Sequence, residues 1–152
     1  MIGTLVSELC DMSPMRALVV AHDTSLADVL AQLAQDHDLR SVCIVDVDER
    51  LVGVVNPHDL LQLIKVRLQI PRDRREVPVR RVRRLVMAKT IDDLMLVGSA
   101  ETAVSLQDTL ADTLNKMSQY DLVSIPVVDS EGRVVNDLRL SEVLSFAMAA
   151  VV

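Results

Sequence analysis

Residues 41–61, SVCIVDVDERLVGVVNPHDLL, contain two apolar runs that flank a charged turn and lead into the start of a helix. The runs at 42–45 and 51–55 are rich in β-branched residues and are short enough to be buried strands. Asn56 can cap the following helix with its side-chain oxygen, and Pro57 suits the first helical position because it has no amide hydrogen. The stretch therefore predicts a strand, a turn, a second strand and a helix.

The same pattern returns in the second half of the chain. Residues 124–144 read SIPVVDSEGRVVNDLRLSEVL, and aligning the two stretches sets Ser41 on Ser124 and Arg50 on Arg133. An internal repeat of this length indicates two paired units rather than a solenoid. Because a unit of half the chain is marginally stable alone, we expect the two repeats to pack on each other.

The segments around these stretches complete a strand-helix-strand-strand-helix unit in each half. Leu5, Val6 and Leu9 predict a short lead-in helix packed on the first repeat, and the apolar spacing after Ser25 predicts a helix to about Gln35. A later helix is expected to bury one apolar stripe, with its arginines on the other face, formed by Val79, Val82, Val86 and Ile91. The remaining elements are predicted at about 17–21, 100–105, 110–117, 124–128, 133–138 and 140–149.

The composition limits both the core and the function. Half of the 152 residues are hydrophobic, but only Tyr120 and Phe146 are aromatic, so the core must be aliphatic. Platforms that stack single-stranded nucleic acid need rows of aromatic side chains, so this function is excluded. Cys10 and Cys43 show no paired spacing, and Cys43 falls in a buried-strand pattern where a free thiol acts as a small hydrophobe. A reduced, cytoplasmic protein is expected.

Neither a signal peptide nor a membrane span is predicted. Glu8 and Asp11 interrupt the only early apolar run, and no stretch approaches the roughly 18 uncharged apolar residues of a spanning helix. The apolar run at 146–152 is interpreted either as a terminal helix or as the edge of a longer segment.

The net charge of −6 conceals one basic segment. Residues 65–89 hold ten basic and two acidic residues, leaving six basic and twenty acidic residues in the rest of the chain. The stretch from Pro71 to Pro78 has too few apolar residues to be buried and is predicted to be an exposed, mobile loop. The chain is accordingly divided into a lead-in helix with the first repeat, a charged linker, and a connecting helix with the second repeat, at 1–68, 69–79 and 80–152.

The arginines of the linker allow several interpretations. They can form a solvated loop, pair with the acidic body, touch a polyphosphate tail, or bind nucleic acid or anionic lipid electrostatically. Nothing in the sequence supplies base readout, so nucleic acid is not the expected partner.

The repeated unit resembles the CBS domain, a family that occurs in tandem pairs called Bateman modules. The resemblance rests on SIPVVDSEGRVV at 124–135 and on GVVNPHD at 53–59, which is similar to the family signature of glycine, two apolar residues, Thr or Ser, two residues and aspartate. It implies the fold class α/β (α+β), with two β-α-β-β-α repeats packed side by side as a pseudo-two-fold unit. Two clefts between the repeats are then expected, and such clefts commonly bind AMP, ADP, ATP or S-adenosylmethionine.

The resemblance also assigns expected roles in the first cleft. Asp59 occupies the position of the ribose-binding aspartate, and Asn56 replaces the usual Thr or Ser that meets phosphate. His58 is a further candidate on the phosphate side, and backbone groups near Val42 and Cys43 are expected to read the adenine edge.

The second repeat departs from the family pattern. Asn136 replaces the glycine, Arg139 the Thr or Ser, and Glu142 the aspartate. Arg139 can pair with a phosphate through two parallel hydrogen bonds, but we expect this cleft to be weaker or empty.

Three classes of function stay open. The first is a non-catalytic regulatory module that binds an adenosyl ligand and transmits this to a partner protein or an attached effector. The second is a structural homodimerisation module without ligand, and the third is a weakly specific binder of nucleic acid or an anionic surface through the arginine-rich linker. No nucleophile, base and oxyanion constellation can be assembled and no Cys or His spacing suggests a metal, so we expect no catalysis, no required cofactor and no metal site. A homodimer is expected.

Overall fold

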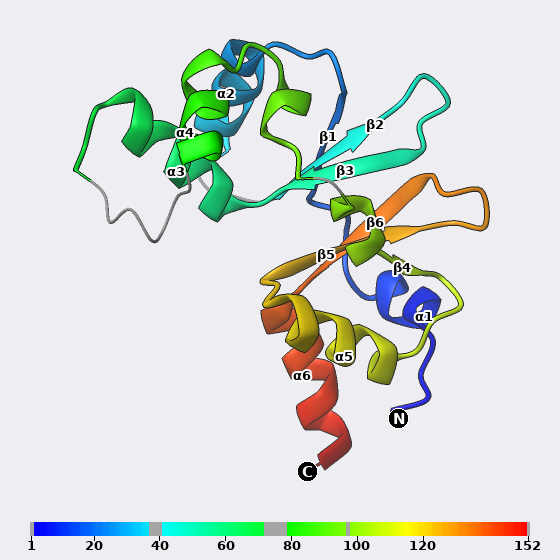
Figure 1. Ribbon diagram of the computed structural model, residues 1–152. Coiled ribbons are helices and arrows are strands. Elements are labelled where there is room, and N and C mark those ends of the chain that lie inside the picture. The colour runs from blue at the N-terminus through cyan, green and yellow to red at the C-terminus, as the bar shows by residue number, and fades with distance from the viewer. Residues whose placement is uncertain (1, 37–40, 72–78, 97, 152) are drawn as a thin grey trace.

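The computed structural model describes residues 2–36, 41–71, 79–96 and 98–151. They form two lobes, each built from one three-stranded sheet with helices packed against it, and the lobes lie side by side (Figure 1). The β-α-β-β-α order predicted for each repeat is confirmed.

The first lobe contains the first repeat, whose elements are β1 (Leu18–Ala21), α2 (Leu26–Gln35), β2 (Val42–Val45), β3 (Leu51–Val55) and α3 (Pro57–Arg67). The second lobe contains the second repeat, with β4 (Val104–Ser105), α5 (Leu110–Tyr120), β5 (Ser124–Val128), β6 (Val134–Arg139) and α6 (Leu140–Val151). In both sheets the middle strand runs parallel to the first strand and antiparallel to the third. All four residues of β2 are buried, as its continuous apolar pattern predicts.

Residues that are counterparts in the two repeats meet each other between the lobes. The hydroxyl oxygens of Ser41 and Ser124 lie 2.6 Å apart, and Arg50 forms an antiparallel bridge with Arg133. A residue can contact its own counterpart only on the axis that relates the two copies. The predicted pseudo-two-fold arrangement is therefore observed, and its axis passes between the two members of each pair.

The predicted lead-in helix is present as α1 (Val6–Asp11), but it packs on the second lobe and not on the first. Val6 and Leu9 are buried in the second core, and the Val6 amide donates to the Asp108 carbonyl at 2.8 Å. The expected packing on the first repeat was wrong, because an apolar stripe shows that a face is buried but not against which core.

The core of the first lobe is likewise completed by a segment from outside its own repeat. The segment between the repeats forms α4 (Val79–Met87) and a 3-10 turn, η1 (Ile91–Leu94), and both contribute buried residues to the first core. The Leu26 amide donates to the Lys89 carbonyl at 2.9 Å, which ties this segment to the start of α2. Each core is thus completed by the segment that precedes the other repeat's sheet.

The apolar stripe of α4 differs from the predicted one. Val79 and Val86 are 82% and 57% exposed, whereas Leu85 is fully buried. Arg81 also turns inward, its side chain only 11% exposed, although all the arginines were expected on the outer face. The predicted mobile loop at Pro71–Pro78 falls almost entirely outside the described residues.

The strand predicted at 100–105 is reduced to the two residues of β4. A 3-10 turn, η2 (Ser99–Thr102), precedes it because Gly98 adopts a left-handed conformation with φ of 81° and the Thr102 hydroxyl donates to the Ser99 carbonyl at 2.7 Å. This turn lies where the two lobes face each other.

The C-terminal apolar run, up to Val151, forms the end of α6, which points away from the sheets in Figure 1. Within the described ranges, no helix combines the length and the apolar character that crossing a bilayer requires.

Candidate ligand-binding cleft

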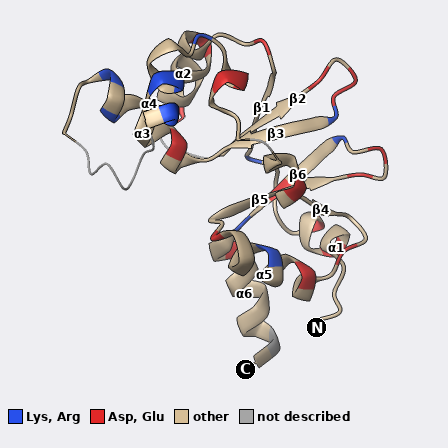
Figure 2. Cartoon of the chain, in the orientation of Figure 1, with Lys and Arg blue, Asp and Glu red and all other residues tan. Residues whose placement is uncertain are grey.

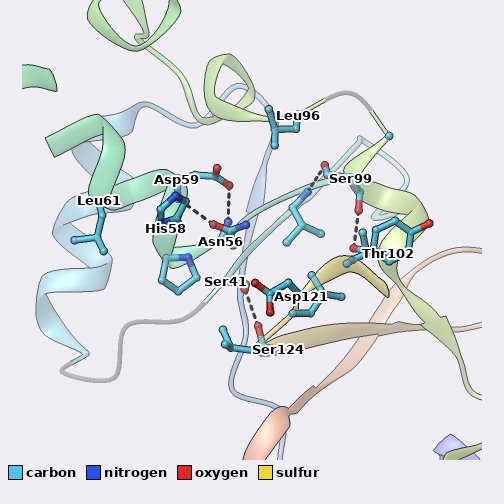
Figure 3. A pocket seen from close by; sticks show the side chains of 16 residues that line it. Ser41, Asn56, His58, Asp59, Leu61, Leu96, Ser99, Thr102, Asp121 and Ser124 are labelled. Atoms are coloured by element: carbon cyan, nitrogen blue, oxygen red, sulfur yellow. Dashed lines mark hydrogen bonds between the residues drawn. The ribbon is translucent and has the colours of Figure 1, made fainter. Parts of the chain in front are cut away.

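A cleft of about 660 Å³ opens between the two repeats. Asn56, His58 and Asp59 line it from the first repeat, and Ser99 and Ser124 are among the residues that line it from the second (Figure 3). Its volume is within the roughly 300–1,000 Å³ typical of small-molecule sites. The structure therefore brings three of the predicted site residues together in one cavity.

The local sequence NPHD places the Asp59 carboxylate at the start of α3. The Asp59 backbone amide donates to the Asn56 side-chain oxygen at 2.9 Å, and the Asn56 backbone amide donates to Asp59 Oδ2 at 3.0 Å. This reciprocal pair is a capping box, which satisfies two amides that a helix start leaves without partners. Pro57 at the first helical position fits because its missing amide hydrogen is not needed there.

Asp59 is almost fully buried, with 7% of its side chain exposed, and Arg81 from α4 lies beside it. Arg81 Nη2 is 3.5 Å from Asp59 Oδ1, and the same nitrogen donates to the Leu94 carbonyl at 3.0 Å. Burial raises the pKa of Asp59, while the Asn56 amide, the Arg81 guanidinium and His58 act in the opposite direction. The sequence did not predict the role of Arg81. It is one of four arginines in α4, and their spacing does not show which of them points inward.

His58 projects at the edge of the cleft. Its Nε2 lies 3.0 Å from Gln62 Nε2, one helical turn further along α3, and the residue is exposed. The position is compatible with the predicted contact to a ligand's phosphate side, and this role stays a prediction.

The second repeat contributes more to this cleft than the sequence predicted. Ser99 Oγ accepts a hydrogen bond from the Val54 amide at 2.9 Å, so η2 is fixed to strand β3 of the first lobe. Tyr120 and Asp121, at the end of α5, also line the cleft, and Asp121 adopts a left-handed conformation with φ of 53°. Tyr120, one of the two aromatic residues of the chain, is thus available to a ligand in this cleft.

Val42 and Cys43 are not among the described residues that line this cleft. Both lie in β2, the middle strand of the first sheet, and are at most 1% exposed. Burial raises the pKa of the Cys43 thiol to about 12, so it behaves as a core residue. Ser41, the residue directly before Val42, does line the cleft, and so do Leu122–Ser124, because the pseudo-two-fold axis brings the start of β5 from the other repeat beside Ser41.

The corresponding region of the second repeat is arranged differently. Glu142 accepts from the Arg139 amide at 3.3 Å, which copies half of the capping box at Asp59. Asn136, in place of the glycine, donates to the Ser13 carbonyl at 3.2 Å, and Asp137 accepts from the Arg16 amide at 2.8 Å. These two side chains tie the chain before β1 onto β6.

Arg139 and Glu142 differ in their positions relative to the first cleft. Arg139 lines an adjoining groove of about 410 Å³ together with Leu140 and Leu144 of α6, and this groove shares Ser41, Pro57, Val123 and Ser124 with the first cleft. Glu142 is not among the described residues that line either of these two cavities. Arg139 thus lies next to the first cleft, and the contributions of Arg139 and Glu142 to ligand binding stay predictions.

Basic residues occur at several positions of α4 (Figure 2), and its arginines other than Arg81 are exposed. Arg80, Arg83 and Arg84 border a hollow of about 310 Å³ together with Asp93. Hydrogen bonds from the Lys89 and Thr90 amides lower the pKa of Asp93, so its carboxylate is already occupied. Within the parts of the chain that the structure describes, no group of three or more potential metal ligands is found.

The sequence and the fold were compared with those of known proteins. A family model for the CBS domain matches residues 6–66 and 91–149. CBSX2, solved in complex with AMP, is 25% identical over 97% of this chain and 98% of its own, with a TM-score of 0.70. No curated protein sequence matches this chain significantly.

Two further solved structures share the fold. A CBS domain-containing protein from Thermotoga maritima is 22% identical, with a TM-score of 0.72 over 97% of this chain and 96% of its own. The CBS domain pair of protein MJ0100, solved with 5′-methylthioadenosine and S-adenosyl-L-methionine, is 20% identical, with a TM-score of 0.67 over 97% and 98%. The two matched segments of the family model cover the two repeats, so the chain belongs to the CBS-domain family and contains a tandem pair of these domains.

Proposed function

We propose that this protein is a non-catalytic regulatory module that binds an adenosyl ligand in the cleft beside Asp59. The observation that carries the proposal is the cleft itself. It lies between the repeats, and its wall includes Asp59, whose side chain is only 7% exposed. The complex of CBSX2 with AMP supports the same ligand class.

The cleft offers a suitable group for each part of such a ligand. A carboxylate accepts hydrogen bonds only, so ionised Asp59 suits the two neighbouring hydroxyls of a ribose. The start of α3, with Asn56 and His58, favours a phosphate because a helix N-terminus carries partial positive charge. Tyr120, Leu96 and Val123 supply apolar surface for the base.

The second cleft is proposed to bind more weakly or not at all. The side chains of Asn136 and Asp137 are hydrogen-bonded to the segment before β1, and Glu142 replaces the shorter aspartate. We therefore expect one adenosyl ligand per chain.

Isothermal calorimetry with AMP, ADP, ATP and S-adenosylmethionine tests the proposal. We expect heat from at least one of them with a stoichiometry of one per chain. Absence of heat with all four at millimolar concentration contradicts ligand sensing and leaves the structural-dimer alternative. Salt-sensitive retention on anionic vesicles or RNA, lost when Arg80 and Arg83 are replaced, is instead the result that the electrostatic alternative requires.

A homodimer is proposed from the exposed apolar residues of two helices. The starts of α3 and α6 border the same groove, which includes Pro57 and Leu144. Further along these helices several large apolar side chains are at least 40% exposed, namely Leu61, Ile64, Leu68 and Met148. Covering them in a two-fold interface of more than about 1,000 Å² in total would produce a stable dimer. Light scattering at tens of micromolar chain is expected to give twice the chain mass, and a monomer mass contradicts the proposal.

The regulatory output is proposed to pass through contacts between the module and a partner protein or an attached effector. The adenosyl ligand contacts both repeats in this arrangement, so its binding changes how firmly the lobes are held together.

A further inference from the structure

Arg81 occupies a position that connects three parts of the molecule. It belongs to α4, which packs against α3, and its Nη2 lies 3.5 Å from Asp59 Oδ1. The same nitrogen donates to the carbonyl of Leu94, at the end of η1, 3.0 Å away. Two residues beyond Leu94 the chain enters the cleft wall at Leu96.

Fold stability alone does not account for this buried pair. Both side chains are largely removed from water, with 11% of Arg81 and 7% of Asp59 exposed. Replacing a buried ion pair by apolar residues of similar volume is often neutral or stabilising, since desolvating the two charges costs as much as their attraction contributes. Arg81 Nη1 is buried and has no hydrogen-bond partner among the described residues, which adds a further cost.

Ligand binding in the cleft would account for the ion pair of Arg81 and Asp59. To accept hydrogen bonds from two ribose hydroxyls, the Asp59 carboxylate must be ionised and held in one orientation. Burial works against ionisation, while the hydrogen bond from the Asn56 backbone amide and, after it, the guanidinium favour it. His58, its neighbour on α3, also acts on the carboxylate, and Arg84 on α4 acts on Arg81 in turn. Asp121, at the end of α5, lies in the wall of the same cleft.

We propose that Arg81 is a positioning residue for the ligand cleft, holding the Asp59 carboxylate charged and oriented toward the ribose hydroxyls through the 3.5 Å contact. This inference rests on the proposed function. Arg81 does not touch the ligand, because it is not among the described residues that line the cleft. The linker helix α4 is therefore part of the binding apparatus, although it lies outside both repeats.

The test compares AMP affinity across pH in variants of α4. R81M removes the charge and keeps the bulk, R81Q removes the charge and keeps a donor for the Leu94 carbonyl, and R81K restores a charge. R83M is the matched control, since Arg83 lies on the same helix but is exposed. Calorimetry from pH 8 to pH 5.5 gives Kd for each protein, and dividing by the wild-type value at the same pH cancels the titration of the AMP phosphate.

We expect the relative Kd of R81M and R81Q to rise as the pH falls, approaching tenfold per pH unit once Asp59 binds a proton, because only the ionised carboxylate accepts both hydroxyls. R81K and R83M should keep a flat ratio. Thermal melting without ligand shows which variants are folded at each pH, and R81Q decides the question if R81M is not folded.

The two possible failures are distinguishable. A flat ratio for a folded R81M or R81Q overturns the role of Arg81 and leaves the proposed function standing. If the wild type itself does not bind AMP, the proposed function fails, and the role of Arg81 fails with it.

Discussion

Replacing Asp59 by alanine is expected to weaken AMP binding by about ten- to a hundred-fold. Hydrogen bonds to a charged group contribute roughly 1.5–3 kcal/mol, and about 1.4 kcal/mol corresponds to a factor of ten in Kd. Asp59 is oriented by the capping box with Asn56, so the bound ligand does not have to order it. The measurement is the Kd of D59A by calorimetry at neutral pH.

E142A is the matched control for this experiment. Glu142 occupies the same place at the start of α6, where it accepts a hydrogen bond from the Arg139 amide, but it does not line the described part of the first cleft. Both substitutions remove one cap, but D59A also leaves the buried Arg81 without its carboxylate partner, so thermal melting without ligand shows whether D59A is folded. Only D59A should lose affinity. D59A should also lose the preference for AMP over 2′-deoxy-AMP. Equal binding by D59A and the wild type would refute the ribose contact.

Replacing Leu85 by alanine is expected to destabilise the protein by about 2–5 kcal/mol, the usual cost of removing a buried leucine side chain. Leu85 is fully buried in the first core, although it belongs to the linker helix α4. Urea unfolding gives the change in the free energy of unfolding from the midpoint and slope.

V86A is the control for the loss of Leu85. Val86 is the next residue on the same helix and is 57% exposed, so its replacement should change stability by no more than about 0.5 kcal/mol. If L85A and V86A were equally mild, α4 would not be part of the first core in solution.

Local patterns in the sequence predicted the repeated unit well. The stretch NPHD predicted the helix start, and the structure shows its capping box and the burial of Asp59. Alternating and continuous apolar runs predicted the strands, because the period of burial is a local property. The pairing of Ser41 with Ser124 follows from the alignment of the repeats once they pack about an axis.

Tertiary relations were not predictable in the same way. The stripe at Val6 and Leu9 fits either core, and only the three-dimensional structure shows that it belongs to the second. Backbone groups near Val42 and Cys43 were predicted at the adenine edge, and the structure adds that Leu122–Ser124 of the other repeat line the cleft together with Ser41. Arg81 has the same local pattern as its exposed neighbours, and the partner that makes it different is distant in sequence.

Each half of the chain needs the other to complete its core, because α1 packs in the second core and α4 and η1 pack in the first. A fragment that ends after α3 carries α1, which belongs to the second core, and lacks Leu85 and Ile91, which complete its own. Neither half is therefore a self-sufficient building block, even though each contains one full copy of the repeated motif. In evolutionary terms, duplication of the motif was accompanied by mutual dependence, so that the pair, rather than the single domain, is the unit that can be inserted into other proteins or removed from them.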